Sequence, residues 1–119
     1  MFTVGIITSS DKGYSGDRED KSGQVIKSIV EEAGFEVKRK VILPDEKDLL
    51  KKEMVFMCDE LNLNLILTTG GTGFSKRDIT PESTKEVIER ETPGISEAIR
   101  YYSLEITKRA MLSRATSGI

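Results

Sequence analysis

The sequence predicts an α/β fold, a three-layer, doubly wound and mostly parallel sheet flanked by helices. Three mainly apolar runs have the length of strands, and segments with apolar residues at helical spacing alternate with them. Right-handed crossovers between parallel strands then favour an order in which the first strand lies between the second and the third. The chain has 119 residues, and we expect a single domain that covers 1–119.

The first strand is predicted at Phe2–Thr8, which is almost continuously apolar, as in a strand buried on both faces. The polar segment Ser9–Asp20 is expected to form a long loop. Gly34 is expected to end the helix that follows. The apolar residues of that helix recur at helical spacing: Val25, Ile26, Ile29, Val30 and Ala33.

The second strand is predicted at Phe35–Leu43, where apolar and charged residues alternate, as in a strand nearer a sheet edge. A second amphipathic helix should follow Pro44. Its apolar stripe consists of Leu50, Met54, Met57 and Leu61. Cys58 lies on the same stripe, and we expect it to be a buried small hydrophobe.

The third strand, at Asn64–Thr69, leads directly into the stretch TTGGTGFSKRDITPE. Thr80 is expected to cap a helix that reaches Arg90, with Pro81 at its first position. The tripeptide TPG breaks this helix, and a final helix is expected from about Ile95 to Arg109. The charges of that helix suit a solvated face, although an oligomer interface is also possible.

Composition excludes several classes of function. Net charge is −2, with 18 basic and 20 acidic residues closely interspersed, so duplex nucleic acid is not expected as a partner. Histidine is absent, which excludes Ser-His-Asp triads, Cys-His nucleophiles and His-ligated zinc. A single cysteine cannot form an intrachain disulfide and fits a reducing cytoplasm. No run approaches the roughly 20 apolar residues that span a bilayer, and the apolar opening lacks the basic leader of a signal peptide.

The polar loops that follow the three predicted strands should meet at one rim of the sheet. Ligands of doubly wound sheets bind beyond the carboxyl ends of the strands, where the strand order reverses. An isolated glycine cluster is more often a plain tight turn. At this rim, the glycine loop is instead expected to expose backbone N–H groups as a nest for anions, supplemented by Lys76 and Arg77. It is neither a Walker A motif nor a dinucleotide fingerprint.

Carboxylates at the same rim have two interpretations. Asp45 could cap the second helix and Asp78 could be a helix-entry residue, or the two could share Mg²⁺ beside a bound phosphate. Asp11 could orient a ligand or form an Asx-turn. Asp20, with Ser22 and Gly23, combines capping potential with proximity to the rim.

The motifs ITSSD, DKSG, LPDE, TTGGTGFSKRDITPE, PGISE and LSR, in this order, resemble the MogA/MoaB family of molybdenum-cofactor biosynthesis proteins, whose domain also occurs in gephyrin. The match runs from the first strand to Ser113 and Arg114, and the long glycine-containing block is very specific. The extended loop after the first strand and the DKSG motif look closer to the MogA branch.

The resemblance implies a molybdopterin adenylyltransferase, which transfers AMP from Mg-ATP to the terminal phosphate of molybdopterin and releases pyrophosphate. It also implies Mg²⁺ as cofactor, ATP and molybdopterin as substrates, a cytoplasmic homotrimer and a separate partner protein that inserts molybdate.

The resemblance also implies roles for individual residues. Asp45 and Asp78 match the two aspartates that the family needs for catalysis, and they would hold the metal. Asp11 and Ser113 fall in motifs near the nucleotide and pterin pocket. The family's phosphate-cradling loop matches Gly70, Gly71, Thr72 and Gly73.

One departure keeps other functions open. Family members continue after LSR into a strand, a turn and a further helix, whereas this sequence ends at ATSGI and is therefore expected to lack that C-terminal strand and helix. A catalytically silent, MoaB-like molybdopterin-binding or scaffold module is the main alternative to an enzyme. A different nucleotide-handling enzyme, like the related domain of CinA proteins, is a third.

Overall fold

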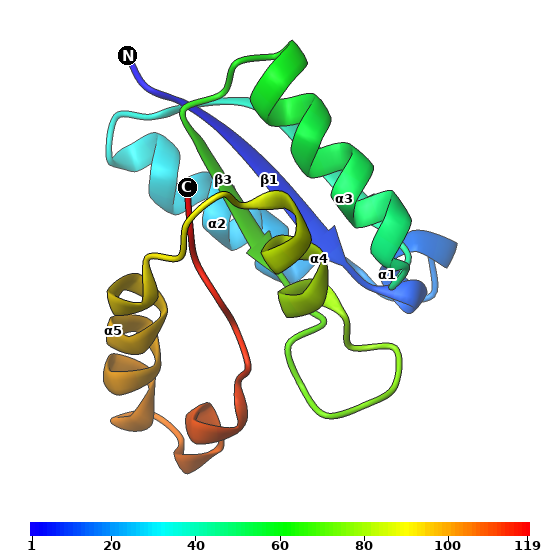
Figure 1. Cartoon of the computed structure of the whole chain (residues 1–119), viewed down its shortest axis with the longest axis vertical. Helices are drawn as coiled ribbons and strands as arrows, with labels where there is room; N and C mark the ends of the chain where they lie inside the picture. Colours follow the sequence, from blue (N-terminus) through cyan, green and yellow to red (C-terminus); the bar gives the residue numbers. More distant parts are fainter.

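A computed structural model describes residues 1–119 and confirms the predicted sheet (Figure 1). Three parallel strands, β1 (Thr3–Ser9), β2 (Glu36–Leu43) and β3 (Leu65–Thr69), lie in the order β2-β1-β3. The central strand therefore donates and accepts backbone hydrogen bonds on both sides, as its almost continuous apolar sequence indicates.

Helices cover both faces of the sheet, which gives the three layers that the sequence predicts. On one face, α2 (Lys21–Glu32) packs Val30 against Val4 and Ile6 of β1. On the other, α3 (Lys47–Val55) joins Ile7 of β1 in a second core. The two cores follow from strand geometry, because successive side chains of β1 point to opposite faces.

A short helix interrupts the segment that was expected to be a loop. The helix α1 (Asp11–Ser15) begins at Ser10, whose hydroxyl accepts a hydrogen bond from the Gly13 N–H, and ends at Gly16 with φ 87°. Its five residues have no apolar periodicity, so the caps at its two ends, and not burial of an apolar face, determine where the helix forms. Gly34 follows α2 with φ 95°, which confirms the predicted stop.

The second amphipathic helix is only partly as predicted. Leu50, Met54 and Met57 are buried, but Leu61 and Cys58 are exposed, so the prediction that Cys58 is buried was wrong. The helix passes from α3 into a π-helical turn, η1 (Phe56–Glu60). A π turn holds more residues than an α turn, so the side chains that follow it rotate away from the apolar stripe.

The C-terminal helices are shorter than expected. The helix α4 (Thr80–Val87) ends before Arg90, and Thr80 is its first residue instead of its cap, because the Thr80 hydroxyl donates to the Gly70 carbonyl. The helix α5 (Pro93–Leu104) ends well before Arg109. The Thr107 hydroxyl caps a separate 3₁₀ helix, η2 (Lys108–Leu112), by accepting from the N–H of Arg109.

The C-terminal segment runs back beside α5, which stands apart from the sheet (Figure 1). Hydrogen bonds connect Ser117 to Ser96 of α5, and Gly118 forms an isolated bridge with Glu91. None of the helices has the length and apolar character required to cross a membrane.

The core around α3 can be tested with two adjacent leucines. Leu50 is 0% exposed and Leu49 is 37% exposed. We expect Leu50→Ala to lower the free energy of unfolding by about 2–5 kcal/mol, because it leaves a cavity between the helix and the sheet. Leu49→Ala should cost much less. Urea denaturation measures both, and equal losses would contradict the assignment of Leu50 to the core.

Candidate functional site

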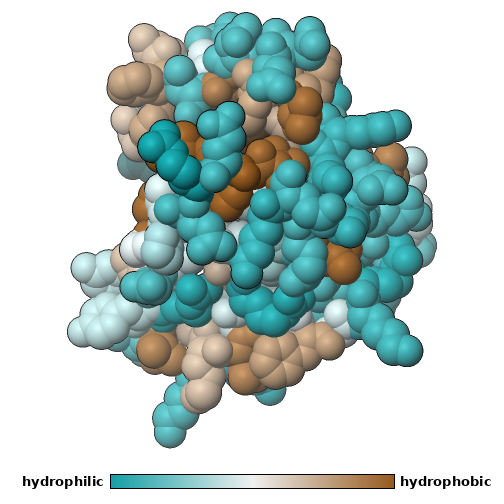
Figure 2. All heavy atoms as spheres, in the orientation of Figure 1, coloured by the Kyte–Doolittle hydropathy of each residue, from teal (hydrophilic) through white to brown (hydrophobic).

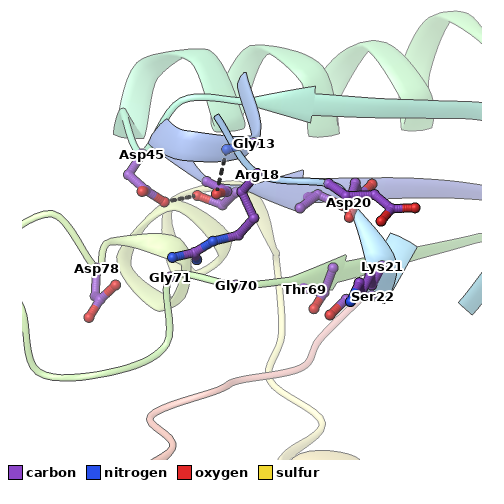
Figure 3. Close-up of a pocket in the computed structure, with 14 residues that line it drawn as sticks. Gly13, Arg18, Asp20, Lys21, Ser22, Asp45, Thr69, Gly70, Gly71 and Asp78 are labelled. Carbon is purple, nitrogen blue, oxygen red and sulfur yellow. Dashed lines mark hydrogen bonds between the residues drawn. The ribbon is translucent and has the colours of Figure 1, made fainter. Parts of the chain in front are cut away.

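A polar cavity of about 690 Å³ lies at the carboxyl ends of the strands (Figure 3). It is lined by the ends of β1 and β3, the glycine loop, the segment around the start of α2, and the residue that follows Pro44. None of the lining residues is hydrophobic. The lining consists of Thr8, Ser9, Ser10, Gly13, Arg18, Glu19, Asp20, Lys21, Ser22, Asp45, Thr69, Gly70, Gly71 and Asp78. The predicted meeting of the three loops at one rim is therefore confirmed.

The glycine loop crosses the end of β1 in a conformation that requires glycine. Gly70 and Gly71 have φ values of 89° and 71°, which side chains strongly disfavour. A Cβ on Gly70 would collide with the Ser9 carbonyl, and one on Gly71 would collide with the Thr80 hydroxyl. The Thr80 N–H and hydroxyl hold the loop by donating to the Gly71 and Gly70 carbonyls at 3.1 and 2.9 Å.

The loop leaves backbone donors free. The N–H groups of Gly70, Gly71, Thr72 and Gly73 donate to no acceptor in the protein. Consecutive amides of this kind form a concave site for oxyanions. Gly70 and Gly71 line the cavity directly, so their amides are the nearest candidates for a bound phosphate.

Asp45 lies in the β2–α3 connection, where two hydrogen bonds hold its carboxylate. The Ser9 hydroxyl donates to Oδ1 at 2.6 Å and the Asp11 N–H donates to Oδ2 at 3.1 Å. Glu46 occupies the N-cap position of α3 and no side chain caps that helix, so the capping interpretation of Asp45 was wrong.

Asp11 does not line the cavity. Its carboxylate accepts two hydrogen bonds from Arg77, at 2.6 and 2.9 Å, and one from the Asp45 N–H at 3.0 Å. The Arg77 hydrogen bonds are the main cause that lowers the pKa of Asp11 to about 2. Arg77 and Lys76 line a smaller hollow that shares Asp45 with the main cavity, and neither residue lines the main cavity, where the two could have supplemented the glycine loop.

Asp78 follows the glycine loop and lines the cavity with Asp45. One carboxylate oxygen, Oδ2, accepts from the Ser75 N–H at 3.0 Å, and the other has no donor in the protein. No group of three or more His, Cys, Asp or Glu side chains in the chain could hold a metal ion. A cation here would therefore depend on one or two carboxylates together with ligand oxygens, an arrangement common for Mg²⁺.

Asp20 caps α2 at the inner wall of the cavity. It accepts from the Gly23 N–H at 3.0 Å, from the Thr8 hydroxyl at 3.0 Å and from the Lys40 ammonium at 3.2 Å. Burial by itself would raise the pKa of Asp20, but these three donors outweigh it and the pKa is lowered. The predicted capping role is confirmed.

Arg114 positions the glycine loop, a role that its motif, LSR, did not indicate. Its N–H donates to the Thr72 carbonyl at 2.9 Å, and its guanidinium donates to the Gly73 and Asp78 carbonyls, each at 2.7 Å. It thereby connects the outer part of the glycine loop and Asp78, which follows the loop, to the C-terminal segment. No local sequence pattern could identify partners 41 and 36 residues away.

Ser113, in contrast, lies outside the cavity. Its carbonyl accepts from Arg100 at 3.4 Å and its hydroxyl accepts from the Ala115 N–H at 3.3 Å. Thr72 and Gly73 also lie beyond the lining, on the outer part of the glycine loop. Of the predicted site residues, the structure therefore brings Asp45, Asp78, Gly70 and Gly71 together.

Comparison with known proteins gives consistent results. Residues 5–119 match the family model described as a probable molybdopterin binding domain. The chain is 40% identical over 121 residues to the molybdopterin adenylyltransferase of Helicobacter pylori strain J99, covering 98% of this chain and 67% of that protein. It is 37% identical to the Escherichia coli K12 molybdopterin adenylyltransferase, covering 98% of this chain and 60% of that protein.

A solved structure shows the same fold. The molybdopterin biosynthesis enzyme MoaB from Thermus thermophilus superimposes with a TM-score of 0.93 at 44% identity, covering 100% of this chain and 75% of that one. The chain thus spans 60% to 75% of the length of these relatives.

The role of Arg114 can be tested by removing its guanidinium. We expect Arg114→Gln to lower the free energy of unfolding by about 1–3 kcal/mol, because two loop carbonyls lose their donors. Backbone order parameters of Gly73, measured by NMR, should fall in parallel. Glu82→Gln is the control, because it removes only the exposed ion pair of Arg114 and should cost about 0–1 kcal/mol. Unchanged mobility of Gly73 in Arg114→Gln would contradict the proposed tie.

The Asp11–Arg77 pair gives a separate test. In Arg77→Gln the pKa of Asp11 should rise from about 2 toward its ordinary value of 3.8, because the main hydrogen-bond donor is lost. NMR titration of the Asp11 carboxyl carbon between pH 1.5 and 5 measures this directly. A pKa that stays near 2 would show that other groups hold the carboxylate charged.

Proposed function

The chain belongs to the probable molybdopterin binding domain family, and on that basis we propose that it is a molybdopterin adenylyltransferase. In this reaction a phosphate oxygen of molybdopterin attacks the α-phosphorus of ATP, a new phosphoanhydride bond forms, and the bond to pyrophosphate breaks. The curated relatives named for this activity, at 35–40% identity over nearly the whole chain, support the proposal.

The observation that carries the proposal is the composition of the cavity. Free glycine-loop amides and two carboxylates without ionic partners line one polar space, and no hydrophobic side chain interrupts it. Phosphate groups need donors and, where their charge is high, a hard cation held by carboxylates. The cavity brings such donors and two carboxylates together.

In this mechanism, residues of the chain itself bind and align the substrate phosphates. The Gly70 and Gly71 amides would donate to phosphate oxygens and hold the α-phosphorus in line with the attacking oxygen. The attacker is already anionic, so no histidine or other general base is needed. This fits a site whose ionisable side chains are carboxylates and cations.

The donor set fits Mg²⁺. Asp78 has one carboxylate oxygen without a protein donor, and Asp45 lies in the same cavity with its side chain held by Ser9. Asp45 and Asp78 would hold the ion together with phosphate oxygens, and the bound ion would neutralise the charge that develops on the leaving pyrophosphate.

The assembly state is also part of the proposal. We expect a homotrimer, and the exposed apolar side chains of α5 support an interface between copies, since large exposed apolar areas often mark contact sites. These side chains include Ile95, Ile99, Tyr101 and Tyr102. The face shown in Figure 2 is largely hydrophilic, with hydrophobic areas near its centre and at its lower edge. A molybdate-inserting partner protein and a cytoplasmic location stay predictions.

The direct test is pyrophosphate release from Mg-ATP with and without molybdopterin. Release that requires molybdopterin is the expected result. Release from ATP alone would indicate a different nucleotide-handling enzyme. Molybdopterin binding without any release, measured on folded protein, would favour a catalytically silent binding module.

In the same assay, Asp78→Asn should lower turnover by about 100-fold or more, because it removes a charge that acts on the reacting phosphates while the Ser75 hydrogen bond can persist. Asp59→Asn is the matched control, since Asp59 is exposed in the π turn and lies outside the cavity. Full turnover by Asp78→Asn would remove Asp78 from the mechanism.

A further inference from the structure

Arg18 is a free cation in the wall of the cavity. Its guanidinium forms neither an ion pair nor a hydrogen bond within the protein, whereas Arg39, Arg77 and Arg114 all pair with carboxylates. Figure 3 shows the Arg18 side chain extending from the segment before α2 toward Gly71. A guanidinium that lines a ligand-sized cavity and has no protein partner is available for a ligand.

The backbone that carries Arg18 is held in place. The N–H groups of Asp17 and Arg18 both donate to the Lys12 carbonyl, at 2.9 and 3.2 Å. Gly16 makes this reversal possible with its φ of 87°, and a side chain there would meet no atom within 4 Å. The glycine is therefore required for the backbone turn and not for close packing. This turn holds the backbone of Arg18 at the cavity wall and leaves its guanidinium free.

The charges of the cavity explain why a cation is useful there. Four carboxylates line it, from Glu19, Asp20, Asp45 and Asp78, and only Asp20 has an ionic partner, Lys40. These charges would repel a polyphosphate. Arg18 and Lys21 are the two cationic residues in the lining, and neither belongs to an ion pair. Arg18 lies in the polar segment that joins β1 to α2, and Lys21 is the first residue of α2.

We propose that Arg18 binds phosphate oxygens of the anionic substrate, opposite the free Gly70 and Gly71 amides, with Lys21 as a second positive charge. The inference rests on the proposed function and assigns a phosphate-binding role to the part of the cavity wall that faces the glycine loop. A planar guanidinium can donate two parallel hydrogen bonds to one phosphate group, which a lysine ammonium cannot do. Arg18 therefore orients the phosphate as well as attracting it.

The test is binding of inorganic pyrophosphate, measured by calorimetry on the full chain. Arg18→Gln should weaken binding by about 10-fold or more, since a charge-assisted hydrogen bond is lost, and Arg18→Lys should restore only part of it. Arg109→Gln is the control with the same change in net charge, because Arg109 is exposed and lies outside the cavity. Binding by Arg18→Gln equal to wild type, or an equal loss in Arg109→Gln, would overturn the proposal.

Two further arms identify which phosphate Arg18 contacts. A raised KM for Mg-ATP with unchanged KM for molybdopterin assigns Arg18 to the triphosphate, and the reverse assigns it to the molybdopterin phosphate. Pyrophosphate binding needs no turnover. Loss of binding in Arg18→Gln therefore supports the phosphate-binding role of Arg18 even if the chain proves inactive. Turnover by Arg18→Gln with unaltered binding and KM values would reject that role and leave the proposed adenylyltransferase function standing.

Discussion

The site depends on the burial of β1 between two parallel partners. Because β1 is hydrogen-bonded on both edges and covered on both faces, its final residues can point only into the two layers and toward the rim. The Thr8 hydroxyl bonds to Asp20 at the start of α2, and the Ser9 hydroxyl bonds to Asp45 before α3. The Ser9 carbonyl meets the backbone of Gly70. Alternation along one strand thus positions three separate loops.

Charged groups around the site fall into two sets. Asp11, Asp20 and Arg114 have ionic partners, and each also forms a hydrogen bond with the backbone of another segment. Asp45, Asp78 and Arg18 line the cavity and form no ion pair. The first set has ionic partners within the protein and connects the loops to their surroundings. The second is left to interact with ligands, which is the distribution expected of a pre-organised phosphate site.

Segments whose structure follows from apolar patterning were predictable. The three strands, the α2 stop at Gly34 and the buried positions of α3 were all evident, because burial imposes a period of two on strands and about 3.6 on helices. Errors lie where a polar contact or a change of helix type overrode the local pattern. Thr80 looked like a cap but donates to Gly70, and the π turn moved Cys58 to the surface.

The sequence by itself determined the layered α/β fold, the convergence of three polar loops and the family, because patterning and motif order are local properties of the chain. Only the tertiary structure decided which side chains face the cavity. It turned Asp11 toward Arg77, left Ser113 outside, and brought Arg18 into the cavity wall. It also brought Arg114 to the glycine loop. Such contacts join residues tens of positions apart, and their geometry exists only once the sheet has aligned the loops at one rim.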